Sequence, residues 1–288
     1  MLESPRADLD ERPRRAERLD ADLLRAWPLP VDDEGDKYSR GTVLVIAGSA
    51  RTPGAALLAG RAALRMGAGR LQIATVTDVA IAVGIAVPEA MVLPFDDAED
   101  RLSQSIADVD AVVVGPGLDG DDVVAIVERV LGGCRPDSVV VLDAAAIMVF
   151  ADLDPALVER TRSQLLMTPN RQEARSLIAD PRDDDTAVLI DAARSTGAVL
   201  TSFGGVHAPD GRSWRSDVEA LGLGTSGSGD VLAGLVGGAA ARCGDRTRAA
   251  CWATFAHLEA GRRLEARVGV LGYTASDLLS EVPACLPR

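Results

Sequence analysis

Residues 42–69 read TVLVIAGSARTPGAALLAGRAALRMGAG. The first six residues form a continuous apolar run that ends at Gly48, which is typical of a strand buried on both faces. The part from Pro53 onward has proline at its first position and glycines at its end, the pattern of a helix start and stop. This stretch therefore predicts a strand followed by a helix, the repeating unit of an α/β fold.

The same alternation continues along the chain. Further apolar, β-branched runs predict strands over 71–76, 111–115, 138–143, 164–168 and 198–203. The last part of the chain predicts helices over 228–243, 246–266 and 274–281. We predict an α/β fold in which helices cover both faces of a mostly parallel sheet, with ligands at the carboxyl ends of its strands.

Residues 1–36 differ from the rest of the chain because they are rich in Asp, Glu, Arg and Pro. We expect a charged N-terminal arm, either flexible or wrapped over the surface, with room for one short helix near Leu23, Leu24 and Trp27. Residues 37–288 are expected to form a single domain, since no internal repeat or second linker is found.

The 288-residue chain is acidic, with 43 Asp and Glu against 30 Lys and Arg and a formal net charge of −13. This charge argues against capture of nucleic acid or of an anionic membrane, but leaves small anionic ligands open. No apolar run reaches the roughly 18 residues of a membrane span, and the four cysteines lack CxxC spacing. We expect a cytoplasmic protein. Among the basic residues only Lys37 is a lysine.

The sharpest local signal is GLGTSGSGD at 222–230, which opens directly onto the apolar pattern VLAGLVGGAAA. A glycine-rich stretch at a helix start presents unpaired backbone N–H groups at the positive end of the helix dipole, which together bind anions. It is not a Walker A loop, because no GK[ST] follows. Asp230 either complements the helix dipole or serves as a base toward a hydroxyl that attacks a phosphoryl group.

Eight collinear motifs between residues 37 and 283 carry a resemblance to a known family. They are KYSRGTVLVIAGS, PGAALLAGRAALRMGAG, VPEAM, VVVGPGL, VVLDAAAI, LMTPNRQEA, GTSGSGDVLAG and YTASDLL. The chain resembles the ADP-dependent NAD(P)H-hydrate dehydratases of the ribokinase-like superfamily. The resemblance implies the three-layer sandwich of that superfamily. It also implies a repair reaction, in which ADP, or ATP in some relatives, phosphorylates the C6 hydroxyl of hydrated NADH or NADPH before phosphate is eliminated.

The resemblance also implies roles for particular residues. Asp230 matches the catalytic aspartate, and the amides of Gly227, Ser228 and Gly229 would stabilise the transferring phosphoryl group. The positions that contact the hydrate are Ala55, Gly117, Asn170 and Asp230. The positions that contact the nucleotide are Thr201, Ser202, Phe203, Gly204, Gly205 and Gly229. Mg²⁺ would accompany the nucleotide, with no metal-ligating side chain assigned, and a homotetramer is expected because members of the family often form one.

Three departures from the family pattern affect these expectations. The family reads VLDADAL where this chain has Ala145 in place of the second carboxylate, and its TPHPGE motif has Asn170 where the histidine stands. Asparagine still donates and accepts hydrogen bonds, so contact with the substrate can survive. The KGAxT segment appears at 201–205, shortened and without its lysine, which leaves open the nucleotide affinity and which nucleotide binds.

Two other functions remain open at this stage. A small-molecule kinase of the same superfamily, acting on a vitamin alcohol, also uses GSGD for phosphoryl transfer, although PGAALLAGRAALRMGAG and VPEAM favour the dehydratase. The three departures would also suit a nucleotide-binding protein that has lost catalysis. His207 and His257 are expected to serve packing, and neither is assigned a role.

Overall fold

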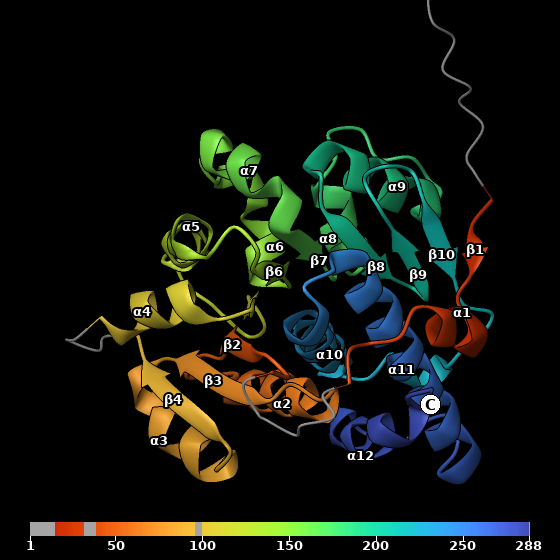
Figure 1. Ribbon diagram of the computed structural model, residues 1–288, viewed down its shortest axis with the longest axis horizontal. Helices are drawn as coiled ribbons and strands as arrows, with labels where there is room; N and C mark the ends of the chain where they lie inside the picture. The colour runs from red at the N-terminus through yellow and green to blue at the C-terminus, as the bar shows by residue number, and fades with distance from the viewer. Residues whose placement is uncertain (1–14, 32–38, 96–99, 288) are drawn as a thin grey trace, which may run out of the picture.

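The computed structural model describes residues 15–31, 39–95 and 100–287. The boundary expected between residues 36 and 37, and Lys37 itself, lie outside these ranges. The described residues form a ten-stranded sheet in the order β1-β10-β9-β8-β7-β6-β5-β2-β3-β4 (Figure 1). The strands are β1 (Glu17–Arg18), β2 (Thr42–Ile46), β3 (Arg70–Thr75), β4 (Ala90–Pro94), β5 (Ala111–Val114), β6 (Val139–Leu142), β7 (Leu165–Met167), β8 (Val199–Ser202), β9 (Gly205–His207) and β10 (Ser213–Arg215). Only β9 runs antiparallel to its neighbours in this sheet.

Helices cover both faces of the sheet. One layer contains α1 (Ala21–Ala26), α2 (Pro53–Arg65), α3 (Thr77–Ala86), α10 (Ser228–Cys243), α11 (Arg246–Arg267) and α12 (Ala275–Cys285). The other contains α4 (Arg101–Asp108), α5 (Val123–Gly133), α6 (Ala145–Met148), α7 (Pro155–Thr161), α8 (Arg171–Ser176) and α9 (Asp185–Thr196). The predicted three-layer fold is confirmed.

The pleat of the central strands explains the two cores. Along β2, Val43 and Val45 belong to the core under α2 and α10, whereas Leu44 and Ile46 belong to the core under α4 and α5. All four side chains are fully buried. A strand that buries both faces has no polar positions to alternate with apolar ones, which is why residues 42–47 read as one continuous run.

Helix α10 lies directly on α2 because its glycines permit close contact. A Cβ atom on Gly234 would come within 2.1 Å of the Ala59 carbonyl oxygen, and one on Gly238 within 2.4 Å of the Ala63 carbonyl oxygen. The glycine- and alanine-rich sequence of α10 is therefore a packing requirement. It fixes the start of α10 against the helix that follows β2.

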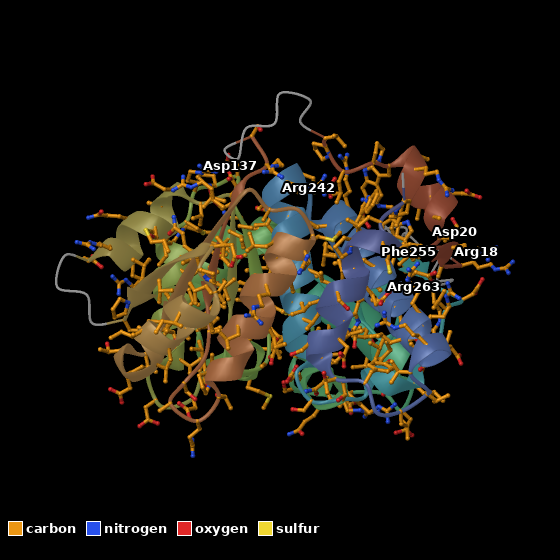
Figure 2. All side chains as sticks on the ribbon, turned by 90° about the horizontal axis from the view of Figure 1, so that it is seen from below. Arg18, Asp20, Asp137, Arg242, Phe255 and Arg263 are labelled. Atoms are coloured by element: carbon orange, nitrogen blue, oxygen red, sulfur yellow. The ribbon has the colours of Figure 1, made fainter. Side chains whose placement is uncertain are left out.

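The described part of the N-terminal segment, residues 15–31, packs on the domain. Strand β1 pairs with β10 and forms one edge of the sheet, and Leu19 and Leu24 are buried in the same core as α11. The indole Nε1 of Trp252 donates to the carbonyl oxygen of Trp27 at 2.8 Å. Figure 2 labels Arg18 and Asp20 of this segment on the same side of the molecule as Phe255 of α11.

The order of the strands indicates where a ligand binds. From β2 the chain continues through β3 and β4 on one side, and then returns to the other side of β2 for β5. The crevice at the carboxyl ends of such diverging strands is the usual ligand site of an open α/β sheet. None of the helices described is long and apolar enough to cross a membrane.

Candidate active site

The glycine-rich stretch opens α10 as the sequence predicts. Gly227, with φ of 84°, is the N-cap and offers no side chain to the helix. The Ser228 N–H is bonded to the Thr225 carbonyl oxygen at 3.2 Å, but no residue in the described ranges accepts from the N–H groups of Gly229 and Asp230. A Cβ atom on Gly229 would meet nothing within 4 Å, so this first turn is open to a ligand. We call residues 227–230 the cradle.

Asp230 holds a half-buried carboxyl group in the cradle. Burial raises its pKa from 3.8 to about 6, because a carboxylate in a poorly hydrated site loses solvation. A Cβ atom on Gly227 would lie 3.8 Å from the Asp230 Oδ2 atom, so the carboxyl stands against the backbone of the cradle. A base with this proton affinity, beside an anion site, is suited to accept a proton near neutral pH.

A second carboxyl group lies behind the first. Asp143 follows β6 and is buried, and the Thr168 hydroxyl donates to its Oδ1 at 2.7 Å. Burial raises the pKa of Asp143 to about 7, with Glu173 and Asp230 adding to the rise through like-charge repulsion. The ends of β6 and β7 and the start of α10 therefore bring three carboxyl groups into one electrostatic cluster.

Two of the predicted substrate residues meet at the carboxyl ends of β2 and β5. A Cβ atom on Gly117, which has φ of 63°, would approach the Ala55 Cβ to 2.5 Å, so only glycine fits there. The Thr52 hydroxyl donates to the Gly117 carbonyl oxygen at 2.7 Å, and the Gly48 N–H donates to the Pro116 carbonyl oxygen at 2.8 Å. These bonds hold the two strand ends together at the carboxyl edge of the sheet.

Asn170 is the exposed N-cap of α8. Its Oδ1 accepts from the N–H groups of Gln172 at 2.8 Å and Glu173 at 3.0 Å. Its backbone N–H and Nδ2 both donate to the Glu173 carboxylate, at 2.9 and 2.6 Å, which completes a capping box. Residues 170–173 have the N-x-x-E spacing of this motif, so the sequence carried the signal for the role of Glu173.

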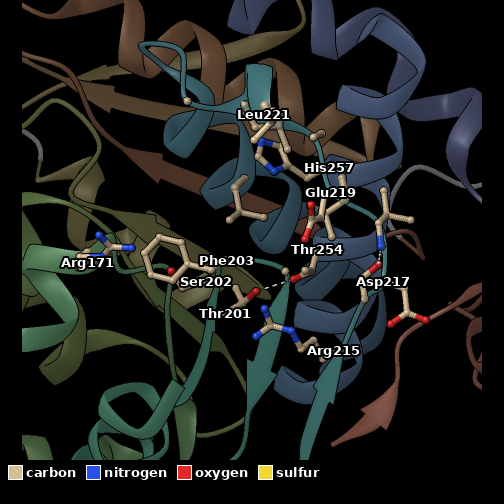
Figure 3. Close-up of a pocket in the computed structure, with 18 residues that line it drawn as sticks. Arg171, Thr201, Ser202, Phe203, Arg215, Asp217, Glu219, Leu221, Thr254 and His257 are labelled. Atoms are coloured by element: carbon tan, nitrogen blue, oxygen red, sulfur yellow. Dashed lines mark hydrogen bonds between the residues drawn. The ribbon is translucent and has the colours of Figure 1, made fainter. Parts of the chain in front are cut away.

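A cavity of about 860 Å³ lies beside the cradle, between the β8–β9 turn and α11 (Figure 3). Thr201, Ser202, Phe203 and Gly204 line it, whereas the other predicted nucleotide residues, Gly205 and Gly229, do not. The remaining lining residues are Arg171, Arg215, Ser216, Asp217, Val218, Glu219, Ala220, Leu221, Leu223, Gly224, Leu232, Thr254, His257 and Leu258. A volume of this size is within the usual range for small-molecule sites.

Helix α11 connects the cavity to the cradle. The His257 ring lines the cavity, and its Nε2 lies 3.0 Å from the Ser228 hydroxyl, with both side chains buried. Burial lowers the pKa of His257 to about 4, although a hydrogen bond with the Ser228 backbone opposes this shift, so the ring is neutral at neutral pH. One turn earlier, Thr254 bonds to Thr201. The sequence showed no sign of the His257 contact, because its partner is distant in the chain.

The carboxyl cluster offers oxygen donors, which are the ligands that Mg²⁺ prefers. Within the described ranges, however, no three His, Cys, Asp or Glu side chains form a group that could hold a metal by themselves. Mg²⁺ usually keeps its waters and binds one or two carboxylates together with the phosphates of a substrate. The residues present therefore fit a metal that arrives with a nucleotide, and do not form a closed metal site.

Several known proteins are similar to this chain. A family described as NAD(P)H-hydrate dehydratase matches residues 43–284. The ADP-dependent (S)-NAD(P)H-hydrate dehydratase of Xanthomonas campestris is 39% identical, over 95% of this chain and 97% of that protein. The bifunctional NAD(P)H-hydrate repair enzyme Nnr of Gloeobacter violaceus is 35% identical, and the match covers 95% of this chain but 55% of the relative.

Solved structures with low sequence identity share the fold. A ribokinase-like superfamily protein of Enterococcus faecalis superposes with a TM-score of 0.82 at 22% identity, over 93% of this chain and 94% of that one. The ADP/ATP-dependent NAD(P)H-hydrate dehydratase of Bacillus subtilis, co-crystallised with ATP and Mg²⁺, gives a TM-score of 0.78 at 24% identity, over 94% and 98% of the two chains. The family match over residues 43–284 and the 39% identity to the Xanthomonas relative identify the chain as a member of the NAD(P)H-hydrate dehydratase family.

Proposed function

We propose that this protein repairs hydrated NADH or NADPH. ADP or ATP phosphorylates the C6 hydroxyl of the damaged ring, and phosphate is then eliminated. The observation that carries the proposal is the placement of the Asp230 carboxyl, with its pKa raised to about 6, at the unpaired N–H groups of Gly229 and Asp230. Family membership supports the same reaction, since the Xanthomonas relative is named an ADP-dependent (S)-NAD(P)H-hydrate dehydratase.

In the proposed reaction, Asp230 accepts the proton of the C6 hydroxyl while the oxygen attacks the terminal phosphorus of the nucleotide. The bond between that phosphorus and its bridging oxygen breaks, so that AMP leaves from ADP, or ADP leaves from ATP. The cradle, with Gly227 at its N-cap, Ser228 braced by His257 and the open Gly229, holds the transferring group at the positive end of α10. Phosphate then leaves C6, and a proton leaves the neighbouring ring carbon, which restores the ring double bond. Bound Mg²⁺ would neutralise the phosphate charge, with Asp143 and Glu173 as its candidate protein ligands.

We assign the hydrate to the crevice beside Ala55, Gly117 and Asn170, and the nucleotide to the cavity at 201–205 with Gly229 at its phosphate end. We further propose that the protein is cytoplasmic and forms a homotetramer. Its main domain would span residues 37–288, preceded by the N-terminal segment 1–36. Its partners would be small molecules, with neither nucleic acid nor membrane among them. The net charge of −13 disfavours nucleic acid and anionic membranes as partners. It does not disfavour a small anionic ligand, because the cradle attracts anions through backbone dipoles and needs no basic surface.

The test is recovery of absorbance at 340 nm when the purified protein is incubated with hydrated NADH and either ADP or ATP, with Mg²⁺ present. We expect recovery that depends on the nucleotide and is accompanied by release of inorganic phosphate. The same preparation should be offered a vitamin alcohol with ATP as a kinase control. Phosphorylation of that alcohol without recovery of absorbance would replace the proposed reaction with a kinase reaction.

A second candidate is a nucleotide-binding protein without turnover. The capping box favours it, because both ends of the Asn170 amide are already hydrogen-bonded within α8 and must exchange partners to touch a substrate. Ala145 favours it as well, since it brings no carboxyl to the start of α6. Binding of ADP by calorimetry, together with absent turnover of hydrated NADH and of hydrated NADPH, would establish this alternative.

A further inference from the structure

The turn between β8 and β9 has an unusual residue at its tip. Ser202 pairs with Gly205, which leaves Phe203 and Gly204 as a two-residue hairpin turn. Their φ angles are 49° and 74°, both positive, as in a type I′ turn. Asn-Gly and Asp-Gly are the usual pairs in such turns, whereas a bulky aromatic residue with positive φ is an outlier. Phe203 is therefore held in a backbone conformation that its side chain disfavours.

Packing does not account for this phenylalanine. Its side chain is 51% exposed and belongs to neither hydrophobic core. The principal neighbour that the structure shows is Arg171, whose guanidinium carbon lies 5.8 Å from the ring centroid. Arg171 is itself exposed, and its Nε is paired with Asp185 at 2.8 Å. The backbone at Phe203 is strained, yet the exposed ring gains little stabilisation from burial. This combination points to a functional reason for having phenylalanine at this position.

The position of the ring suggests what that reason is. Phe203 lies at the rim of the 860 Å³ cavity, with Arg171 beyond its ring (Figure 3). It is the only Phe, Tyr or Trp among the residues that line this cavity. The lining residues also include the aliphatic Leu223, Leu232 and Leu258 and the charged Arg215, Asp217 and Glu219. The cavity thus combines one aromatic ring with aliphatic and polar side chains, and the ring offers a flat heterocyclic base a surface on which to stack.

We propose that the Phe203 ring stacks on the adenine base of the bound nucleotide, and that Arg171 holds the ring in place. The proposal rests on the proposed function only for the identity of the ligand, an adenine nucleotide. Stacking of a base on an aromatic side chain commonly contributes enough to change affinity about tenfold or more. In this chain it would compensate for the lysine that is missing from residues 201–205.

The test is the substitution Phe203→Asn, with the affinity for ADP measured by isothermal titration calorimetry. Asparagine is favoured at this turn position, so the variant should melt at or above the temperature of the parent protein. Loss of the ring should raise the Kd for ADP about tenfold. Phe203→Trp should retain affinity within about twofold, since it keeps an aromatic face. Leu271→Asn is the control, because Leu271 is 75% exposed but does not line the cavity.

An unchanged ADP affinity in Phe203→Asn would overturn the proposal, as would failure of the parent protein to bind ADP. A raised KM for the hydrate with normal ADP affinity would also overturn it, because the ring would then belong to the substrate site. The calorimetric comparison does not require turnover. If the parent protein binds ADP but does not dehydrate the hydrate, the proposed function fails. The difference in ADP affinity between the parent protein and Phe203→Asn still decides the role of Phe203.

Discussion

The β8–β9 turn lines the cavity and the cradle lies beside it, yet the two are built differently. The cradle presents backbone N–H groups at Gly229 and Asp230, on a helix whose glycines fix its distance from α2. The turn presents side chains, and it departs from the family pattern at the missing lysine. The N–H groups of the cradle belong to the backbone, so most side-chain substitutions leave them in place. The contacts made by the turn come from side chains, so a single substitution can remove one of them. We therefore expect substitutions in the cradle to affect chemistry, and substitutions in the turn to affect nucleotide affinity.

The largest effect is expected for Asp230→Asn in the cradle. Asparagine keeps the shape of the side chain but cannot accept the hydroxyl proton, so kcat should fall about 1,000-fold. The ADP Kd should change little by comparison. The measurement is recovery of absorbance at 340 nm with saturating ADP, together with calorimetry. Turnover within tenfold of the parent value would show that Asp230 is not the base.

Gly227→Ala is expected to have the next largest effect. The added Cβ would lie 2.5 Å from the Leu58 Cδ1 atom, on a residue with φ of 84°. Strain and overlap together cost about 2 kcal/mol, and displacement of the N–H groups should lower kcat roughly 10- to 30-fold. Gly244→Ala is a matched control for strain, since Gly244 has φ of 61° but open space around it at the far end of α10. Equal loss of activity in both variants would contradict a special role for the cradle.

The pH dependence should separate the two regions in the same way. The pKa of Asp230 is raised from 3.8 to about 6, so kcat/KM should fall about fivefold between pH 6 and pH 5 as the base becomes protonated. ADP affinity should vary less over this interval. The profile is measured with the hydrate at concentrations below its KM. A profile that is flat down to pH 5 would remove Asp230 from the role of base.

The raised pKa of Asp230 also makes stability depend on pH. As the pH rises, the unfolding free energy should decrease, whereas kcat/KM should increase. Between pH 3.8 and about 6 the folded protein retains a proton on Asp230 that the unfolded chain has lost. The unfolding free energy should therefore decrease as the pH rises through this range, and the shift of Asp143 to about 7 extends the decrease to neutral pH. Urea unfolding at pH 5 and pH 7.5 should show a smaller decrease for Asp143→Asn than for the parent protein.

His257→Phe tests the connection between the two regions. The change removes the bond to Ser228 but fills similar volume, so kcat should fall about fivefold, by roughly the value of one hydrogen bond. His257→Gln, which can still reach the Ser228 hydroxyl, should recover most of the loss. His207→Phe is the control, because His207 is also a buried histidine but neither contacts Ser228 nor lines the cavity. No recovery in His257→Gln would assign the ring to packing alone.

The smallest effect on turnover is expected for Ser202→Ala. The Ser202 hydroxyl donates to the Pro169 carbonyl oxygen at 2.6 Å and so ties the turn to the loop before Asn170. Its loss should lower the unfolding free energy by about 1 kcal/mol and leave kcat within about twofold. Thermal unfolding and steady-state kinetics would test this. A kcat loss comparable to that of Gly227→Ala would erase the distinction between the two regions.

The sequence predicted the fold best where a strand is buried on both faces. Residues 42–46 and 111–114 read as continuous apolar runs and form β2 and β5. Strand β4 was not predicted, because this edge strand is only partly buried and ends at Pro94. Strands β9 and β10 were not predicted because their sequences, GVH and SWR, each contain a single apolar residue, whereas the equally short β7 reads LLM.

The site was predictable in part for the same kind of reason. The spacing of the glycines predicted the cradle, because a glycine-rich helix start is a local feature that can be read directly from the sequence. The raised pKa of Asp143 left no such signal, because it depends first on burial and then on repulsion by Glu173 and Asp230, which only the fold brings near. The contact of His257 with Ser228 joins residues 29 positions apart in the chain, and no motif records that pairing.

The packing of residues 15–31 determines how late in synthesis this segment can fold onto the domain. Strand β1 pairs with β10 through Trp214, and the Trp27 carbonyl accepts a bond from Trp252. A ribosome makes the N-terminal partners first, but they cannot be paired until their partners emerge, 197 positions after Glu17 and 225 positions after Trp27. Such long-range closure is slow, and the segment must wait unpaired meanwhile. Its charged composition, unusual beside the apolar strands, keeps it soluble during that interval.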